Sequence, residues 1–497
     1  MFKNFPGYSL LEKIQKKKSH TRERKLPINA IKLIFIIAIT SVIALLPTES
    51  FGIEGLTVVH QRIISLFVFA ALMWLTEAMP SWVTSMVVVT VMLLTVSTSA
   101  FNFLRPEDGA GLVPFKSIMA CFANPTIMLF IGGFVLAIGL TKVKLDVALA
   151  RVLLKPFGTR SEVVLLGFIL VTAIFSAFVS NTATAAMMLA FLTPVLKSLP
   201  ADGKGRIALA LAIPVGANLG GMITPIGTPP NMIALDYLSS QGMGISFVDW
   251  TIKMAPFVIV LLLLSWLLLR ILFPFKQKHI KIEIEGDIKW NRHTWSVVAA
   301  FAITIFMWMF GTDLWGVDTN VVAMIPIAIF CATGILTRRD LEEINWSVLW
   351  MVAGGFALGV ALNYKDASSV SLSSLIVNTV PFDNFSPLVV MILAGIICFG
   401  FSNFISHSAA TSLLVPVLGV VAGGLGASLD NYGGPQAMLV GIAIASSVSM
   451  ILPISTPPNA IAHSTGFIEQ KDMMKVGIII GLMGLVLGYA MLIFIGF

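Results

Sequence analysis

The amino-acid sequence predicts an all-α polytopic membrane protein built from two related halves. Of its 497 residues, 57% are hydrophobic and 11% are charged, whereas a soluble domain carries about 25% charged residues. Apolar stretches of about 20 residues recur along the whole chain, and each is long enough to cross about 30 Å of hydrocarbon. Three polar motifs occur twice in the same order, which indicates a duplicated unit.

The apolar stretches define the expected elements. Two of them, 163–199 and 386–425, are too long for one helix and too short for two helices with a loop, and each has small polar residues near its middle. This pattern is typical of a broken transmembrane helix. The uncharged end of the chain favours an odd number of crossings, about eleven. The expected spans lie at 29–47, 62–79, 82–98, 125–141, 163–199, 207–222, 253–274, 295–310, 319–336, 346–362, 386–425, 436–453 and 474–497.

Two basic segments predict the topology. Residues 1–27 carry eight Lys or Arg residues, and a second basic segment runs from Lys276 to His293. Basic loops of membrane proteins stay in the cytoplasm. We therefore expect a cytoplasmic tail at 1–27 and a cytoplasmic linker at 275–294 between repeats 28–274 and 295–497, in a multi-pass protein of the inner membrane. Nucleic-acid binding by the tail is disfavoured in so apolar a chain.

The repeated motifs lie 222 to 228 residues apart, a near-constant offset that argues against chance. Because an odd number of crossings in each unit would invert the second copy, the copies are expected to be inverted repeats. The motif pairs are Gly132-Gly133-Phe134 with Gly354-Gly355-Phe356, Ser176-x-x-x-Ser180-Asn181-Thr182-Ala183 with Ser402-x-x-x-Ser406-His407-Ser408-Ala409, and Thr228-Pro229-Pro230-Asn231 with Thr456-Pro457-Pro458-Asn459.

The serine-containing motif has the chemistry of an ion site. Ser176 and Ser180 are four residues apart, on one face of a helix. A helix broken at Asn181 leaves carbonyl groups free at the end of its first half and N–H groups free at the start of its second half. The carbonyl end suits Na⁺, and the N–H end suits an oxygen of a carboxylate, sulfate or phosphate. Helix–helix packing is the alternative for a single copy, but the duplication favours binding.

The Thr-Pro-Pro-Asn motifs predict unwound backbone. Tandem prolines remove two backbone donors and favour an extended segment, which survives inside a membrane only within protein or beside a cavity. Carbonyl groups near Gly227 and Ser455 are therefore expected to bind cations, and the Thr228 and Thr456 hydroxyls an anion. The Gly-Gly-Phe motifs mark either re-entrant hairpins or tight packing. No Lys or Arg accompanies the paired motifs, so neutral donors, helix termini and co-bound cations would hold the anion.

With these motifs in duplicate, residues 29–497 resemble the divalent anion:sodium symporter family. The resemblance implies eleven crossings plus two re-entrant hairpins, a homodimer, and a transport domain that moves like an elevator. It implies C4-dicarboxylate, citrate or sulfate as substrate, usually with Na⁺, although some members exchange anions without Na⁺. By residue, it implies a first sodium site at Ser176, Ser180, Asn181 and the Gly227 carbonyl, a second at Ser402, Ser406, His407 and the Ser455 carbonyl, and an anion site at Asn181, Thr182, Thr228, His407, Ser408, Thr456 and Pro457.

The second copy departs from the family pattern. Where the family has Ser-Asn-Thr, this chain has Ser406-His407-Ser408. Aligning the pattern with Ser402-Asn403-Phe404 instead would place a bulky Phe where the anion needs a hydroxyl. His407 leaves the sodium stoichiometry open, because a protonated imidazole could replace one Na⁺.

The leading functional hypothesis is sodium-coupled uptake of a C4-dicarboxylate such as succinate or malate. Anion exchange, or citrate or sulfate as substrate, is the alternative within transport. An intramembrane enzyme using His407 and the serines would need one distinctive cluster and not a duplicated one, so no enzyme is expected. A channel would show rings of charge along a pore, which the sequence lacks. We expect Asn181 and His407 to line one cavity near the bilayer midplane.

Overall fold

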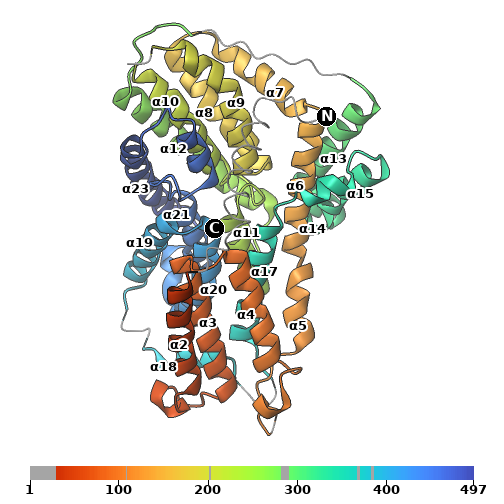
Figure 1. The fold of residues 1–497 in the computed structure, drawn as a ribbon, viewed down its shortest axis with the longest axis vertical. Helices are drawn as coiled ribbons and strands as arrows, with labels where there is room; N and C mark the ends of the chain where they lie inside the picture. The colour runs from red at the N-terminus through yellow and green to blue at the C-terminus, as the bar shows by residue number, and fades with distance from the viewer. Residues whose placement is uncertain (1–28, 108, 201–202, 281–289, 367–369, 382–384) are drawn as a thin grey trace.

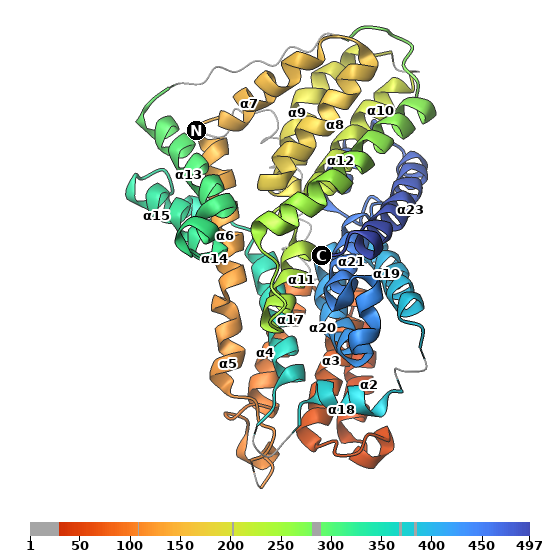
Figure 2. The same cartoon turned by 180° about the vertical axis from the view of Figure 1, so that it is seen from behind.

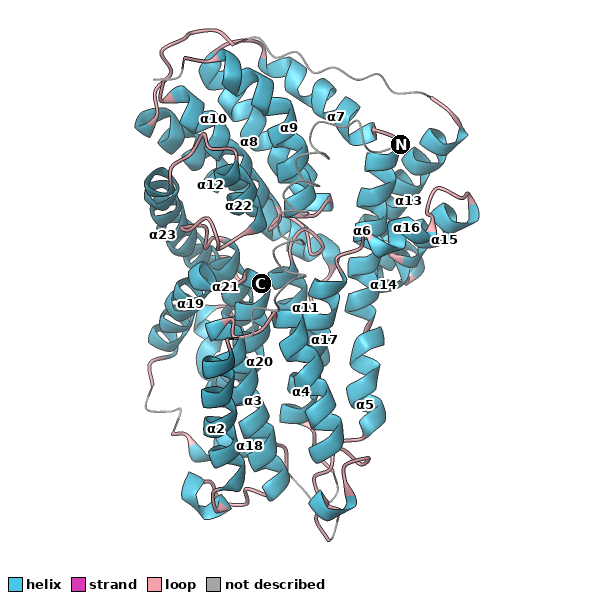
Figure 3. Ribbon diagram, viewed as in Figure 1, coloured by secondary structure: helices cyan, strands magenta, loops and turns pink. Residues whose placement is uncertain are grey.

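The computed structural model describes residues 29–107, 109–200, 203–280, 290–366, 370–381 and 385–497. Within these residues the chain is helical and forms no β-strand (Figure 3). The basic tail and residues 281–289 of the basic linker lie outside the described residues. In chain order the α-helices are α2 (Ala30–Leu45), α3 (Val58–Thr76), α4 (Ser81–Thr95), α5 (Phe115–Ala120), α6 (Pro125–Lys142), α7 (Leu145–Leu154), α8 (Ser161–Phe178), α9 (Asn181–Ser198), α10 (Gly205–Gly220), α11 (Pro229–Ser240), α12 (Phe247–Leu272), α13 (Arg292–Trp315), α14 (Thr319–Val322), α15 (Met324–Ala332), α16 (Arg338–Glu342), α17 (Trp346–Asn363), α18 (Leu372–Thr379), α19 (Pro387–Phe404), α20 (His407–Leu425), α21 (Gly434–Ser447), α22 (Pro457–Ser464) and α23 (Gln470–Phe494).

The helices account for the predicted number of crossings. Nine helical segments in the described part of the chain are long and apolar enough to span a membrane, and five shorter apolar helices accompany them. Three of the nine, α8, α19 and the segment that begins with α20, are arms of hairpins that turn back. The other six and the five shorter helices give eleven crossings, as predicted.

The first hairpin consists of α8 and α9, which lie side by side in Figures 1 and 2. At the start of α8, Ser161 Oγ donates a 2.5 Å hydrogen bond to the carbonyl of Gln277. Gly205, which follows α9, packs against Phe275. Because both ends of the hairpin lie beside residues 275–277, the chain enters and leaves on the same side. The span 163–199 is therefore a re-entrant hairpin, and our interpretation of it as a broken transmembrane helix was wrong.

The second hairpin consists of α19 and α20. The short 3₁₀ helix η7 (Gly426–Tyr432), which follows α20, packs against α19, so this pair also turns back on itself. The same correction therefore applies to the span 386–425. The first hairpin lies at the top of Figure 1 and the second lies lower, and the two approach each other from opposite directions.

The interrupted crossings are α10–α11 and α21–α22, which break between Gly220 and Pro229 and between Ser447 and Pro457. We predicted that the prolines lie in extended backbone, and this prediction was wrong. They occupy the first helical positions of α11 and α22, where a missing N–H removes no helical hydrogen bond. The residues before them, Thr228 and Thr456, are extended, with φ of −146° and −138°.

The asparagines of the two motifs satisfy the unwound backbone in matching ways. Asn231 Nδ2 donates to the carbonyls of Gly221 and Thr224, at 3.0 and 2.8 Å. Asn459 Nδ2 donates to the carbonyls of Met450 and Leu452, at 2.9 and 3.1 Å. Backbone polar groups inside a membrane need such internal partners. The two repeats therefore solve the same local problem with the same residue.

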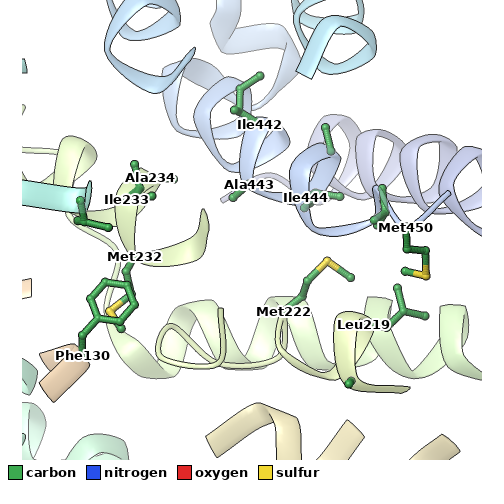
Figure 4. Packing of buried hydrophobic residues seen from close by; sticks show 14 of the residues in the cluster. Phe130, Leu219, Met222, Met232, Ile233, Ala234, Ile442, Ala443, Ile444 and Met450 are labelled. Carbon is green, nitrogen blue, oxygen red and sulfur yellow. The ribbon is translucent and has the colours of Figure 1, made fainter. Parts of the chain in front are cut away.

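Apolar packing holds the interrupted crossings together. Figure 4 shows Leu219 and Met222 beside Met450, with Met232 nearby at the start of α11. These side chains are buried in the main hydrophobic cluster. α10 also approaches α8 closely, because a Cβ added at Gly216 would lie 2.7 Å from the carbonyl oxygen of Ile169. The hairpin and the interrupted crossing therefore pack as one unit.

The Gly-Gly-Phe motifs lie inside the continuous helices α6 and α17 and do not form hairpins. A Cβ added at Gly132 would lie 2.5 Å from the carbonyl oxygen of Ala323, and one added at Gly354 would collide with Ser85. Of the two alternatives left open by the sequence, the structure supports tight packing.

Candidate functional site

A cavity of about 530 Å³ lies where the two hairpin tips meet the two interruptions. The structure brings Asn181 and His407 to this one cavity, as predicted. Ser176 and Ser402 do not line it, because both are fully buried behind the hairpin tips. The other predicted site residues all line it: Ser180, Asn181, Thr182, Gly227, Thr228, Ser406, His407, Ser408, Ser455, Thr456 and Pro457.

Two helices begin at the cavity. Ser180 caps α9 by accepting a 3.3 Å hydrogen bond from the Ala183 N–H, and Ser406 caps α20 through the Ala409 N–H at 3.2 Å. Since α8 ends at Phe178, Ser176 lies in α8 whereas Ser180 caps α9. Our inference that the two serines share one helix face was wrong. The first N–H groups of α9 and α20 have no partner within their helices, so both helix starts are suited to an anion.

Three oxygen atoms surround the side-chain amide of Asn181. Ser176 Oγ lies 2.6 Å from the side-chain amide atom of Asn181 that points toward these oxygens. Ser176 Oγ also donates to the Ala217 carbonyl at 2.7 Å. The same amide atom lies 3.1 Å from the Gly227 carbonyl oxygen and 3.3 Å from that of Ala217. The surrounding groups favour nitrogen at this position, where it donates to these oxygens; with oxygen there, a cation is needed to satisfy the cluster. The Ala217 carbonyl is a participant that sequence reasoning missed, because carbonyl groups leave no sequence signal.

The equivalent position in the second repeat has different chemistry. His407 Nε2 lies 2.5 Å from the carbonyl oxygen of Ser449, so Nε2 carries the proton, since a carbonyl only accepts. Ser446 Oγ donates to the His407 carbonyl at 3.0 Å, and Ser402 Oγ donates to Ser446 at 3.2 Å. Ser455 Oγ donates to the Leu452 carbonyl at 2.6 Å. In the second repeat, therefore, an imidazole N–H donates to the Ser449 carbonyl at the position where the first repeat has the Asn181 amide.

Asn218 is a further lining residue that sequence reasoning missed. Its amide nitrogen donates to Asn459 Oδ1 at 3.0 Å and to Thr456 Oγ at 3.2 Å, which joins the two repeats. Thr456 Oγ also accepts from the Asn459 N–H at 3.1 Å. Because this hydroxyl already accepts twice, its own proton is available for a ligand. The one available signal was a lone Asn inside the apolar span 207–222.

The rest of the cavity wall comes from the loop between α3 and α4, from the first residues of α4, from α6 and from the start of α17, and includes Trp82, Phe134 and Val348. No Lys or Arg lines the cavity in the described part of the chain, and Glu77 is the charged lining residue there. A larger cavity of about 870 Å³, which includes Asp236 and Asn363, contains none of the Ser-Asn or Thr-Pro-Pro-Asn motif residues. The paired motifs therefore place the candidate site in the smaller cavity.

Comparisons with known proteins agree with this fold. A family model described as "Sodium:sulfate symporter transmembrane region" matches residues 28–496. A Haemophilus influenzae protein named "Uncharacterized transporter" is 31% identical over 436 residues, which are 84% of this chain and 88% of that protein. The "Sodium-dependent dicarboxylate transporter SdcS" of Staphylococcus saprophyticus is 29% identical over 462 residues, covering 85% of this chain and 84% of the relative. The crystal structure of the Alcanivorax borkumensis YdaH transporter covers 83% of this chain and 96% of its own, with a TM-score of 0.52 and 12% identity; this last likeness concerns the fold alone.

Proposed function

Because this chain belongs to the sodium:sulfate symporter family of membrane transporters, we propose that it couples sodium influx to the uptake of C4-dicarboxylates. It is a transporter and not an enzyme. The observation that carries the proposal is the meeting of two helix starts and the Asn181 oxygen cluster at one cavity whose described wall has no Lys or Arg. A relative at 29% identity bears the name of a sodium-dependent dicarboxylate transporter.

In this proposal, one Na⁺ binds at the Asn181 cluster. The Asn181 side-chain oxygen is one neutral ligand. Ser176 Oγ and the carbonyl oxygens of Ala217 and Gly227, which all lie within 3.3 Å of that amide atom, are the others. The amide nitrogen of Asn181 is then left for the anion. Because the cation charge lies beside the cavity, each ligand favours binding of the other, which is the coupling that symport requires.

The anion then lies between the two helix starts. The free N–H groups of α9 and α20 face the cavity from different hairpins, a geometry that suits a molecule with an anionic group at each end. The hydroxyls of Thr182, Thr228, Ser408 and Thr456 are the additional donors. Citrate and sulfate present the same oxygen chemistry and remain the alternative substrates.

We further propose that His407 occupies the place of a second Na⁺. Its Nε2–H already donates to the Ser449 carbonyl, so the imidazole supplies a hydrogen-bond donor where a cation would need free oxygens. The second repeat then needs no sodium at this position, and the transporter uses fewer Na⁺ than one with two complete sites. The same observation favours sodium-independent anion exchange as the second candidate function.

The movement, assembly and orientation form part of the same proposal. The hairpins, the interrupted crossings and helices α12 and α23 move together as an elevator-type transport domain, supported by their close packing and by the Asn218–Asn459 link between repeats 28–274 and 295–497. The other helices form the scaffold of a homodimer in the inner membrane. The Lys and Arg density of segments 1–27 and 275–294 supports a cytoplasmic N-terminus.

Uptake of radiolabelled succinate, citrate and sulfate into proteoliposomes tests the proposal. An inward Na⁺ gradient should drive succinate uptake, and replacing Na⁺ by K⁺ or by a pH gradient should abolish it. Asn181→Ala should remove uptake while the protein remains folded, because it removes both a cation ligand and an anion donor. Equal uptake in Na⁺ and K⁺, stimulated by internal succinate, would favour the exchanger. Wild-type uptake by Asn181→Ala would refute the site assignment.

A further inference from the structure

We propose that a hydrogen bond between Asp236 and Thr126 joins the transport domain to the scaffold and favours the state seen in the structure over the opposite state of the transport cycle. Asp236 lies in α11 of the proposed transport domain, and Thr126 lies in α6 of the proposed scaffold. Thr126 Oγ1 donates to Asp236 Oδ1 at 2.8 Å. This inference rests on the elevator movement in the proposed function and adds a residue pair that sets the balance between its two states.

The start of α6 suits a carboxylate. Asn124 caps α6 by accepting a 2.7 Å hydrogen bond from the Thr126 N–H, which fixes Thr126 in the first turn of the helix. The N-terminal end of a helix carries partial positive charge and stabilises a nearby carboxylate. Asp236 therefore meets a hydroxyl donor and the positive end of a helix dipole. A hydrogen bond to a charged acceptor is stronger than one between neutral groups.

The contact lies in the wall of the larger cavity, between the two bodies. The scaffold side of this cavity includes α6, α14 and α17, and the transport-domain side includes α11 and α20. Thr126 and Asp236 both line it. Because α11 packs mainly against α20 and α21 of its own body, it moves with that body. The Thr126–Asp236 bond must then break when the transport domain slides past the scaffold.

The helix α11 also connects this bond to the candidate site. It begins directly after Thr228, which lines the site cavity. Asp236 lies about two turns further along the same helix, at roughly 10 Å for a rise of 1.5 Å per residue. Because one short helix carries both residues, the bond also fixes the position of the site relative to the scaffold.

The second repeat lacks this pair of residues. By the motif offsets of 222 and 228 residues, the counterparts of Thr126 and Asp236 are Val348 and Ser464. Since inverted repeats are related by an axis in the membrane plane, the equivalent contact of the opposite state would join α22 to α17. A valine and a serine cannot form a hydrogen bond to a carboxylate. The Thr126–Asp236 bond therefore stabilises one state without an equivalent in the other.

The test measures how the two states are populated. Spin labels at Asn102 in the scaffold and at Ala427 in the transport domain, both exposed, would report the distance between the two bodies by double electron–electron resonance. The protein would be purified in nanodiscs, with its three native cysteines replaced by alanine. Two distances are expected, one for each state.

Asp236→Asn keeps the size of the side chain and removes its charge. It should lower the ratio of the state seen in the structure to the opposite state by about tenfold or more, the effect of losing one hydrogen bond to a charged group. Thr126→Val removes the donor from the scaffold side and should shift the ratio in the same direction. It is also the variant that decides the question if Asp236→Asn does not fold.

Two controls distinguish a direct bond from a general loss of charge or packing. Since both changes break the same bond, the double variant should shift the ratio no further than the larger single effect. The matched control is Asp249→Asn. Asp249 belongs to the same body and accepts a 2.6 Å hydrogen bond from Ser246 Oγ at the start of its own helix, so this change should leave the ratio as in the wild type.

An unchanged ratio in both single variants, or shifts that add in the double variant, would overturn the inference. Sodium-driven succinate uptake by the same wild-type protein separates this outcome from the proposed function. If the wild type carries succinate and neither variant shifts the ratio, the inference fails and the proposed function stands. If the wild type does not carry succinate, the proposed function fails, while the ratio still decides on the bond. A single distance under all conditions would refute the elevator movement and the inference with it.

Discussion

Gly221 lies directly behind the Asn181 amide, and Gly221→Ala should weaken sodium binding without unfolding the protein. A Cβ at this position would lie 2.6 Å from Oδ1 and 3.0 Å from Nδ2 of Asn181, whereas carbon contacts are most favourable at about 3.5 Å or more. The amide would therefore have to move by about 0.9 Å. The backbone of Gly221 itself is helical, with φ of −60°, so alanine causes no backbone strain.

The displacement should cost one interaction with the cation. Hydrogen bonds to charged groups contribute about 1.5–3 kcal/mol, and each 1.4 kcal/mol is a factor of ten in affinity. If the loss of an ion ligand is comparable, the apparent sodium affinity should fall by about 10- to 100-fold.

Succinate uptake into proteoliposomes, titrated with Na⁺, measures this change directly. Gly423→Ala is the matched control, because an added Cβ at that position meets open space and the sodium titration should match that of the wild type. A Gly221→Ala protein that is folded, as judged by size-exclusion chromatography, and has a wild-type sodium titration would refute the assignment of the cation to the Asn181 cluster.

The remaining predictions concern other parts of the chain. His407→Asn should raise the number of Na⁺ ions carried with each anion, as read from reversal potentials, because it restores an amide in the second repeat; an unchanged stoichiometry would contradict the proposed role of His407. Asp340→Asn should lower the free energy of unfolding at pH 7 by about 2 kcal/mol, since it removes a charge-assisted hydrogen bond and leaves the partly buried Lys142 without its counter-ion. Burial alone would raise the pKa of Asp340, but hydrogen bonds from Lys142 and Thr337 hold it below its ordinary value of 3.8. The stabilising contribution is therefore present at neutral pH and lost in acid below about pH 4, where melting curves of the two proteins should converge. A cysteine at Lys278 should react with membrane-impermeant reagents only in opened cells, and labelling in intact cells would contradict the cytoplasmic position of the linker.

The membrane spans could be predicted from the sequence because hydrocarbon thickness sets a minimum apolar length. The duplication was also visible, since both repeats use an asparagine after tandem prolines to satisfy unwound backbone. The direction of the chain after each break was not predictable. A hairpin and a broken crossing give the same pattern of two apolar arms around a polar centre. Contacts made elsewhere decide between them, such as those of Ser161 with Gln277 and of Gly205 with Phe275.

The candidate site was predictable where side chains carry the chemistry. Asn181 and His407 were expected at one cavity, and the structure places them there; their roles in transport stay predictions. The contributions of the Ala217 and Ser449 carbonyls were not predictable, because every residue has a carbonyl group and its direction depends on the fold. Asn218 gave only the weak signal of one amide in an apolar span.

The central claim is that the Asn181 cluster binds sodium and thereby creates the anion site, and binding linkage tests it most directly. Succinate affinity would be measured on the purified protein by calorimetry across a range of Na⁺ concentrations, with K⁺ maintaining the ionic strength. Saturating Na⁺ should tighten succinate binding, and succinate should tighten Na⁺ binding by the same factor. Both effects should be absent in Asn181→Ala. Succinate binding by the wild type that does not depend on Na⁺, or a linkage that survives in Asn181→Ala, would contradict the claim.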